Sequence, residues 1–261
     1  MKLLYIVLGT LAAGVGSVLV AAMLARALLS AYTQHLLSLA AGALLATAFL
    51  HLLPEAFESG ASPHQLFITL LVGLVFFFLL DKAELWHHGH EHAHHHGHQH
   101  HHDHTQTASP GASGSWSVLL GDSIHAFGDG LLVAAAFLAD VKLGLAASLA
   151  VLAHEVPHHI GDLVVLQQGL GQSRSALIKL SLAGGVTVLG GVVGHSLIAG
   201  HEEWLPYWLT LASSSYVYVA LADLIPQLQK RLTAPATAAQ ITWLLAGIAL
   251  VTGVTQLGHM H

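Results

Sequence analysis

Long apolar runs recur along the whole chain, and they constrain its fold more than any other feature. Each run is about 20 residues long, the length at which an α-helix crosses a hydrocarbon core of about 30 Å. A helix also satisfies its backbone polar groups within one segment, which such a core requires. The sequence predicts eight of these helices, at residues 3–28, 34–56, 65–86, 116–138, 143–168, 175–199, 205–228 and 236–257.

Composition agrees with an all-α fold, a polytopic membrane helix bundle with the lipid bilayer as its surroundings. Only 8% of the residues are charged and 54% are hydrophobic, whereas a soluble domain carries about a quarter charged residues. The chain has no cysteine, so a bound metal would have to be held by nitrogen and oxygen. The formal net charge is −6, and a chain without a basic patch is not expected to bind nucleic acid.

The basic residues predict how the chain is oriented, because cytoplasmic connections are enriched in Lys and Arg. Lys2 and Lys142 fall on one side of the membrane. The other six fall in or beside the odd-numbered connections: Arg26, Lys82, Arg174, Lys179, Lys230 and Arg231. We therefore expect a multi-pass protein of the inner or plasma membrane, with cytoplasmic odd-numbered connections and both termini external.

A histidine-rich segment divides the chain into a first part, residues 1–86 with helices 1–3, and a second part, residues 116–261 with helices 4–8. Residues 87–104 contain 12 of the 23 histidines, and a stretch with Ser, Gly and Pro follows to residue 115. Such low complexity predicts a disordered loop over 87–115, which the topology places in the cytoplasm. Neutral imidazole is a common zinc ligand, so metal capture is favoured over a plain polar spacer.

Two helices share a short internal similarity. Residues 50–55 read LHLLPE and residues 222–227 read ADLIPQ, so that His51 and Asp223 each stand three positions before a proline. The topology runs these two helices in opposite directions, as an inverted repeat requires, and such repeats are typical of secondary transporters. We expect helices 1–3 and 6–8 to be inverted counterparts around helices 4 and 5, with chance similarity between two apolar helices as the alternative.

Helices 4 and 5 carry polar stripes. His125 and Asp129 are four residues apart on helix 4, and therefore lie on one face. On helix 5, His154, His158 and Asp162 follow one another at intervals of four, and Glu155 flanks this row. A divalent cation between the two stripes would offset the cost of burying the carboxylates, which is on the order of 3 kcal/mol for each ionised group. Hydrogen bonds between the helices, or a water-filled crevice, are the alternative.

The segments GDSIHAFGDGLLVAAAF and HEVPHHIGDLVVL resemble the paired helix-4 and helix-5 signatures of the ZIP (Zrt/Irt-like protein) family of metal importers. The resemblance is closest to the histidine-rich branch with an HExPHE-type motif, and HLLPEA and YVALADLIP also resemble that branch. It implies eight helices, external termini and an alternating-access carrier that imports divalent metal into the cytoplasm. Zinc is favoured, with cadmium, iron and manganese as other candidates, and the family allows a homodimer.

The family's metal ligands carry over to His125, Asp129, His154, Glu155 and His158. His51 and Glu55 become candidate pathway residues on the external approach, and Asp162 and Asp223 on the cytoplasmic exit. Two departures bear on the number of ions. Ala126 stands where many members have Asn, and residues 182–194 contain no glutamate. We therefore expect one main ion, with Glu155 and His158 holding at most a weak second one.

Two other classes of protein fit parts of the sequence. Residues 154–158 read HEVPH and satisfy H-E-x-x-H, so an intramembrane zinc metalloprotease is the alternative function. Against it, Pro157 disturbs a straight helix, and Asp129-Gly130 precedes the motif, whereas the comparable element follows it in those proteases. A metal exporter of the cation diffusion facilitator type can also carry a histidine-rich loop, but it usually has six spans. We expect a transporter and not an enzyme.

Overall fold

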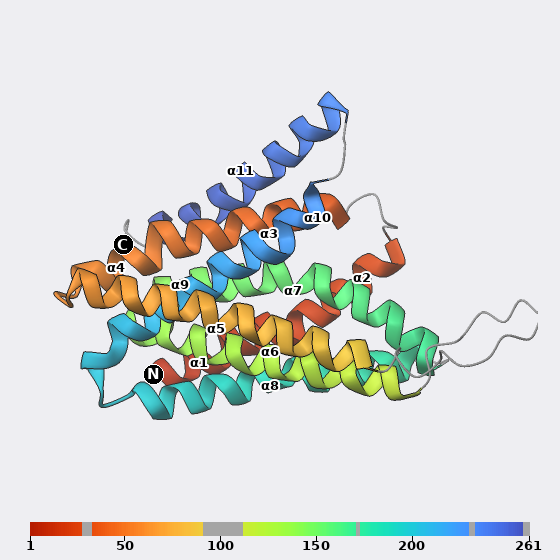
Figure 1. Cartoon of the computed structure of the whole chain (residues 1–261), viewed down its shortest axis with the longest axis horizontal. Coiled ribbons are helices and arrows are strands. Elements are labelled where there is room, and N and C mark those ends of the chain that lie inside the picture. The colour runs from red at the N-terminus through yellow and green to blue at the C-terminus, as the bar shows by residue number, and fades with distance from the viewer. Residues whose placement is uncertain (28–32, 91–111, 171–172, 230–232, 258–261) are drawn as a thin grey trace, which may run out of the picture.

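The computed structural model describes residues 1–27, 33–90, 112–170, 173–229 and 233–257. These residues are helical apart from short turns and contain no strand, which confirms the all-α class. Figure 1 shows most of the long helices lying side by side, with the last helix inclined to the rest.

Eight helical runs follow one another in the described residues. The first two are each interrupted by a π-helical segment: α1 (Lys2–Leu11), η1 (Ala12–Gly16) and α2 (Ser17–Ala27), then α3 (Thr33–Thr47), η2 (Ala48–Leu52) and α4 (Leu53–Glu58). The next four are continuous: α5 (Pro63–His90), α6 (Ala112–Ala139), α7 (Val141–Leu170) and α8 (Ser173–Ile198). The last two are the 3₁₀ turn η3 (Glu202–Trp204) with α9 (Leu205–Tyr218), π-helical η4 (Val219–Leu224) and α10 (Ile225–Leu228), then α11 (Ala234–Leu257).

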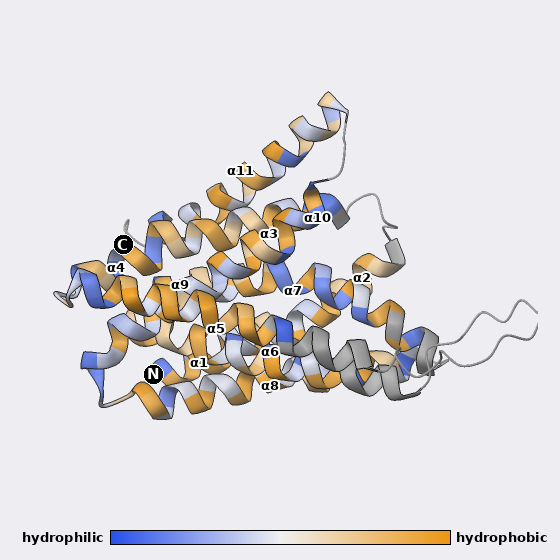
Figure 2. Ribbon diagram, in the orientation of Figure 1, coloured by the Kyte–Doolittle hydropathy of each residue, from blue (hydrophilic) through white to orange (hydrophobic). Residues whose placement is uncertain are grey.

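Seven of these runs are long and apolar enough to cross a membrane, which makes the chain a multi-pass membrane protein. They are residues Lys2–Ala25, Gln34–Glu58, Pro63–Leu80, Leu119–Ala139, Ser173–Ile198, Glu202–Leu228 and Ala234–Gln256. Large apolar side chains such as Phe67 and Leu71 on α5 are exposed. Figure 2 shows hydrophobic residues along most of the long helices. Helix α7 has 30 residues but is not among the seven, because its polar HEVPHH stretch interrupts the apolar sequence.

Alternate connections lie at opposite ends of the bundle. The Nζ atom of Lys2 donates a 2.7 Å hydrogen bond to the carbonyl of Leu138, so the N-terminus lies beside the turn between α6 and α7. Figure 1 places the α4–α5 turn, the α8–α9 turn and the C-terminal end of α11 at this same end. The C-terminal ends of α2 and α5 lie at the other end, as a chain that crosses back and forth requires.

The structure matches the predicted inverted repeat in two ways. Segment η2 ends two residues before Pro54 and segment η4 ends two residues before Pro226, so His51 and Asp223 lie in equivalent π-helical turns. The packing is also reciprocal. Helix α3 of the second run lies against α11 of the eighth, and α9 of the seventh run lies against α5, the third. Likewise α6, the fourth run, lies against α8, the sixth, while α7, the fifth, lies against α2 of the first. The π-helical turns relate helix 2 to helix 7, and the reciprocal packing relates helices 1–3 to helices 6–8 and helix 4 to helix 5.

The histidine-rich connection differs from expectation at its two ends. Helix α5 continues to His90 and helix α6 begins at Ala112, so both helices extend into the 87–115 segment for which disorder was predicted. Adding a residue to an existing helix costs far less than starting one, which allows helices to continue beyond their apolar parts. The remaining predicted loop residues, 91–111, lie outside the described residues.

Glycines bring α6 and α8 into direct backbone contact. A Cβ atom at Gly130 would overlap the carbonyl oxygen of Thr187, and one at Gly190 would overlap the carbonyl oxygen of Phe127. Small residues at such crossings let two membrane helices approach closely. The contact fixes α6, and with it the polar side chains on its opposite face, against the rest of the bundle.

Candidate metal centre

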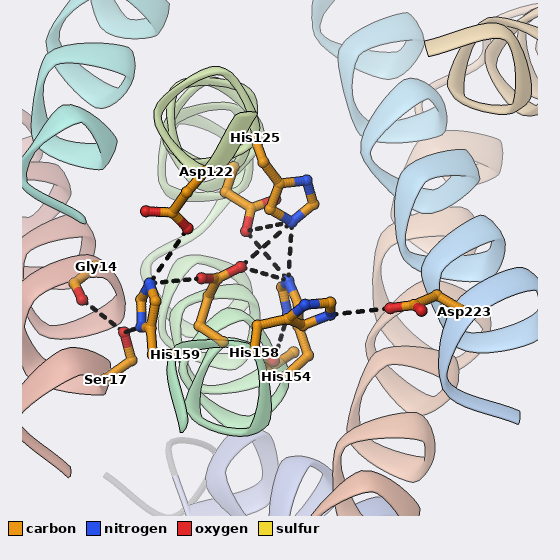
Figure 3. A network of polar contacts seen from close by, with 11 residues as sticks. Gly14, Ser17, Asp122, His125, His154, His158, His159 and Asp223 are labelled. Carbon is orange, nitrogen blue, oxygen red and sulfur yellow. Dashed lines mark hydrogen bonds and ion pairs between the residues drawn. The ribbon is translucent and has the colours of Figure 1, made fainter. Parts of the chain in front are cut away.

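Four of the five predicted ligands meet between two helices. His125 and Asp129 lie on α6, and His154 and Glu155 lie on α7. Figure 3 shows His125 and His154 pointing toward one another. One ligand atom from each of the four lies within 4.8 Å of the others. Asp129, His154 and Glu155 are buried and His125 is half-buried, so His125 is the most accessible of the four.

The spacing of this four-residue cluster suits one small ion. His154 Nε2 lies 3.3 Å from Asp129 Oδ2 and 3.1 Å from Glu155 Oε1. His125 Nε2 lies 3.2 Å from the same Glu155 oxygen and 3.4 Å from His154 Nε2. Ligand atoms of a tetrahedral zinc ion are about 3.4 Å apart, given metal–ligand bonds of about 2.0–2.1 Å. The ligand atoms of the cluster are thus spaced nearly as they would be around a tetrahedral zinc ion.

The hydrogen bond made by His154 fixes which of its nitrogens faces the cluster. Its Nδ1 lies 3.2 Å from the carbonyl oxygen of Ala150, which can only accept, so Nδ1 carries the hydrogen. In the neutral ring, Nε2 therefore presents a lone pair to Asp129 and Glu155. Metal-binding histidines are commonly oriented in this way by the second nitrogen. Asp129 Oδ2 and Glu155 Oε1 are buried without a hydrogen-bond partner, and a cation would satisfy both.

The fifth predicted ligand, His158, borders the cluster but is turned away from it. Its Nε2 atom lies 2.9 Å from Asp223 Oδ2 in η4, as Figure 3 shows. Its ring centroid is 6.2 Å from that of His154 and 6.3 Å from that of His125. A rotation of the imidazole would bring it from the Asp223 carboxylate toward the other two histidines.

Helix α7 stays helical through Pro157. A proline removes one hydrogen bond without ending a helix that its neighbours support, and the expected disturbance of a straight helix stays a prediction. Here His154 faces the cluster and His158 faces Asp223.

The candidate pathway residues are spread over three of the helical runs. Asp223 alone among them is joined by a described contact to a predicted ligand. His51 in η2 is half-buried, with Nε2 3.4 Å from Thr255 Oγ1 on α11. Glu55 on α4 is exposed and Asp162 on α7 is half-buried. The exit assignment of Asp223 thus has a structural link to the cluster, and the other three assignments remain predictions.

Two residues next to the cluster were not singled out from the sequence. Asp122 and His159 gather around Glu155, with one ligand atom of each within 4.8 Å of the others. His159 lies four residues after Glu155, so the two share a helix face, and Asp122 stands one turn before His125. The i, i+4 spacing from Glu155 is the sequence signal for His159, and it marks a different line along α7 from the row that begins at His154.

Comparisons with a family model and with individual known proteins agree on one family. A family model described as ZIP Zinc transporter matches residues 81–255. The chain is 32% identical over 238 residues to zinc transporter ZIP13 of Pongo abelii, an alignment covering 84% of this chain and 66% of that protein. It is 40% identical over 115 residues to human zinc transporter ZIP4, covering 44% of this chain and 18% of ZIP4.

A third relative, human zinc transporter ZIP10, is 32% identical over 144 residues, covering 55% of this chain and 17% of ZIP10. The matched part is thus just under two thirds of the Pongo abelii ZIP13 protein and under a fifth of ZIP4 and ZIP10. All three relatives are named as zinc transporters, which gives the protease alternative no support.

Proposed function

The chain belongs to the ZIP zinc transporter family, and from this premise we propose that it carries divalent metal ions, zinc foremost, across a membrane into the cytoplasm. The transported ion binds between α6 and α7, held by His125, Asp129, His154 and Glu155. The observation that carries the proposal is the buried cluster itself, in which two imidazoles and two carboxylates lie 3.1–3.9 Å apart.

His158 acts as the fifth ligand on this proposal. Its ring stands beside the cluster and bonds Asp223, so one rotation exchanges a carboxylate partner for the ion. The movement gives the ion a route from the cluster toward Asp223 and the cytoplasmic side. His51 and Glu55 line the external approach, and Asp162 lies with Asp223 on the exit.

The choice of zinc rests on ligand chemistry. Imidazole suits zinc and iron, whereas manganese, magnesium and calcium favour carboxylate, carbonyl and water. A site with two or three histidines and two carboxylates therefore favours zinc, with cadmium and iron as competitors and manganese as the weakest.

The topology follows from the same family. Helix α7, the fifth helix in chain order, also crosses the membrane and brings the number of spans to eight. It is surrounded by α6, α3, α2 and α8, which shield its polar residues from lipid. The termini are external and the histidine-rich connection is cytoplasmic, in the inner or plasma membrane. The family also allows two copies to assemble as a homodimer.

Uptake by purified protein in liposomes tests the proposal. Vesicles holding a zinc-sensitive dye should fill faster with the wild-type protein than with Asp129→Asn, which keeps the side-chain shape but removes the charge. The control is Asp140→Asn, since Asp140 is exposed at the α6–α7 turn. Equal uptake by wild type and Asp129→Asn, or uptake of no divalent ion at all, would refute transport through this cluster.

A further inference from the structure

We propose that Asp122, Glu155 and His159 form a second divalent-cation site, which shares the Glu155 carboxylate with the four-residue cluster. The inference extends the proposed function, since Glu155 belongs to both groups. It replaces the expected weak second position at Glu155 and His158 with one on the other side of the Glu155 carboxylate. Zinc or a similar borderline cation fits this site, because the donors are one imidazole and two carboxylates.

The orientation of His159 is set by a residue from the first helical run. Ser17 Oγ donates its only hydrogen to the carbonyl oxygen of Gly14, at 2.5 Å. The same oxygen lies 3.0 Å from His159 Nδ1 and can therefore only accept there. Nδ1 must carry the hydrogen of this bond, and Nε2 of the neutral ring is left with a lone pair.

That lone pair faces two carboxylates. His159 Nε2 lies 3.1 Å from Glu155 Oε2 and 3.4 Å from Asp122 Oδ1 (Figure 3). A lone pair against two carboxylate oxygens is repulsive unless a positive charge stands between them. The distances match the edges of a zinc coordination sphere, which are about 3.4 Å. The same geometry in the first cluster is the basis of the proposed transport site.

Burial makes the need for a cation stronger. The side chains of Asp122, Glu155 and His159 are 7%, 4% and 1% exposed. His159 Nε2 and Asp122 Oδ2 are buried and have no hydrogen-bond partner. A proton on Nε2 would be directed along one bond, whereas a metal ion can bind Nε2 and both carboxylates together. The ion therefore satisfies more of the buried polar atoms than a proton does.

The two oxygens of Glu155 allow both sites to be filled at once. Oε1 faces His125 and His154, and Oε2 faces His159. A bridging carboxylate of this kind neutralises part of the charge of two neighbouring cations. The second site offers three protein ligands, which leaves a coordination position for water, as in zinc sites that exchange their ligands.

The packing of the first run holds Ser17 in place. Segment η1 ends at Gly16, directly before Ser17, and a Cβ at Gly14 would overlap the carbonyl oxygen of Gly184 on α8. The first run and α8 are thus in backbone contact beside the site. This contact fixes the serine that orients His159, as the backbone of α7 fixes His154.

Anomalous diffraction from crystals of the full-length protein with cadmium at pH 8 tests the inference directly. We expect two peaks, one on each side of the Glu155 carboxylate. His159→Phe keeps an aromatic ring but has no ligand atom, so it should remove only the peak beside Asp122. Asp122→Asn is the second variant, in case the ring replacement does not fold, and it should weaken the same peak.

Zinc binding in solution gives a second measure. Equilibrium dialysis of full-length wild type and His159→Phe should differ by one ion per chain, because the histidine-rich segment is common to both. A wild-type peak at the four-residue cluster alone, with no difference in dialysis, would refute the second site and leave the transport site standing. A peak at the second site alone would instead refute the assignment of the transport site.

Discussion

His158 Nε2 lies 2.9 Å from Asp223 Oδ2, and this contact joins α7 to the π-helical segment η4. Both side chains are 39% exposed, whereas Asp129 and Glu155 are each only 4% exposed. The pair therefore stands at the accessible border of the metal centre. On the proposed function, an ion that leaves the buried cluster would meet His158 and Asp223 next.

Asp223→Asn should lower zinc transport on the order of 10-fold, the usual effect of removing a group that orients a metal ligand. The amide keeps the shape of the carboxylate but no longer attracts an ion handed over by His158. Initial rates of zinc uptake into liposomes measure this. Gln227→Ala is the control, because it removes only the 2.8 Å hydrogen bond to Asp223 Oδ1. Equal rates for wild type and Asp223→Asn would contradict a role for this pair.

Loss of a metal ligand should lower zinc transport more than the loss of Asp223 does. We expect His125→Ala, His154→Ala and His158→Ala each to lower transport on the order of 100-fold or more, because a directly bound group exceeds the 10–100-fold typical of its supporting partners. Uptake assays on variants with wild-type expression and thermal stability measure this. The matched control is His201→Ala, which replaces an exposed histidine at the α8–α9 turn. Near-normal transport by well-folded His125→Ala and His158→Ala would disprove the ligand assignment.

Zinc affinity should fall as the pH is lowered from about 7.5 toward about 5.5. Histidine binds metal through a neutral nitrogen, and the ordinary pKa of imidazole is about 6.5, so protons compete with zinc over this range. Competition with a chelator of known affinity gives the dissociation constant at each pH. Removing one competing imidazole with His154→Ala should flatten the slope. A wild-type affinity constant across the range would exclude histidine as the main ligand.

The orientation can be read from single cysteines, because the native chain has none. Ser62→Cys lies in the exposed turn between α4 and α5 and should react with an impermeant thiol reagent applied to intact cells. His98→Cys, in the histidine-rich segment, should react only after the membrane is opened. Labelling of His98→Cys from outside intact cells would contradict the proposed orientation and favour the opposite one.

Most of the helices were predictable from the length of their apolar sequence, and α7 is the exception because its polar HEVPHH stretch interrupts that sequence. Each predicted run overlaps one helical run of the structure, and the errors are a few residues at the ends, as at His90 and Ala112. Those ends lie beyond the apolar sequence, where helix continuation depends on local propensity and not on lipid. The π-helical segments could not be predicted, since nothing in their composition separates them from the α-helix around them.

The cluster was predicted in part. Spacing placed His125 with Asp129, and the resemblance to a family paired them with His154 and Glu155. Periodicity also grouped His158 with His154, but the structure turns His158 toward Asp223 on another helix. Ser17 and His159 are 142 positions apart in the chain, and a contact of that kind follows from packing that a periodic pattern does not contain.

The glycine contacts restrict how any carrier of this shape can work. With no side-chain layer between α6 and α8 at Gly130 and Gly190, and none between the first run and α8 at Gly14, these helices cannot slide past one another without atoms colliding. We therefore expect the first run, α6 and α8 to move together as a single rigid body. Asp122, His125 and Asp129 all project from α6 and would be carried with this body, so any change in access to the two sides of the membrane would have to arise at the opposite wall, where His158 and Asp223 meet.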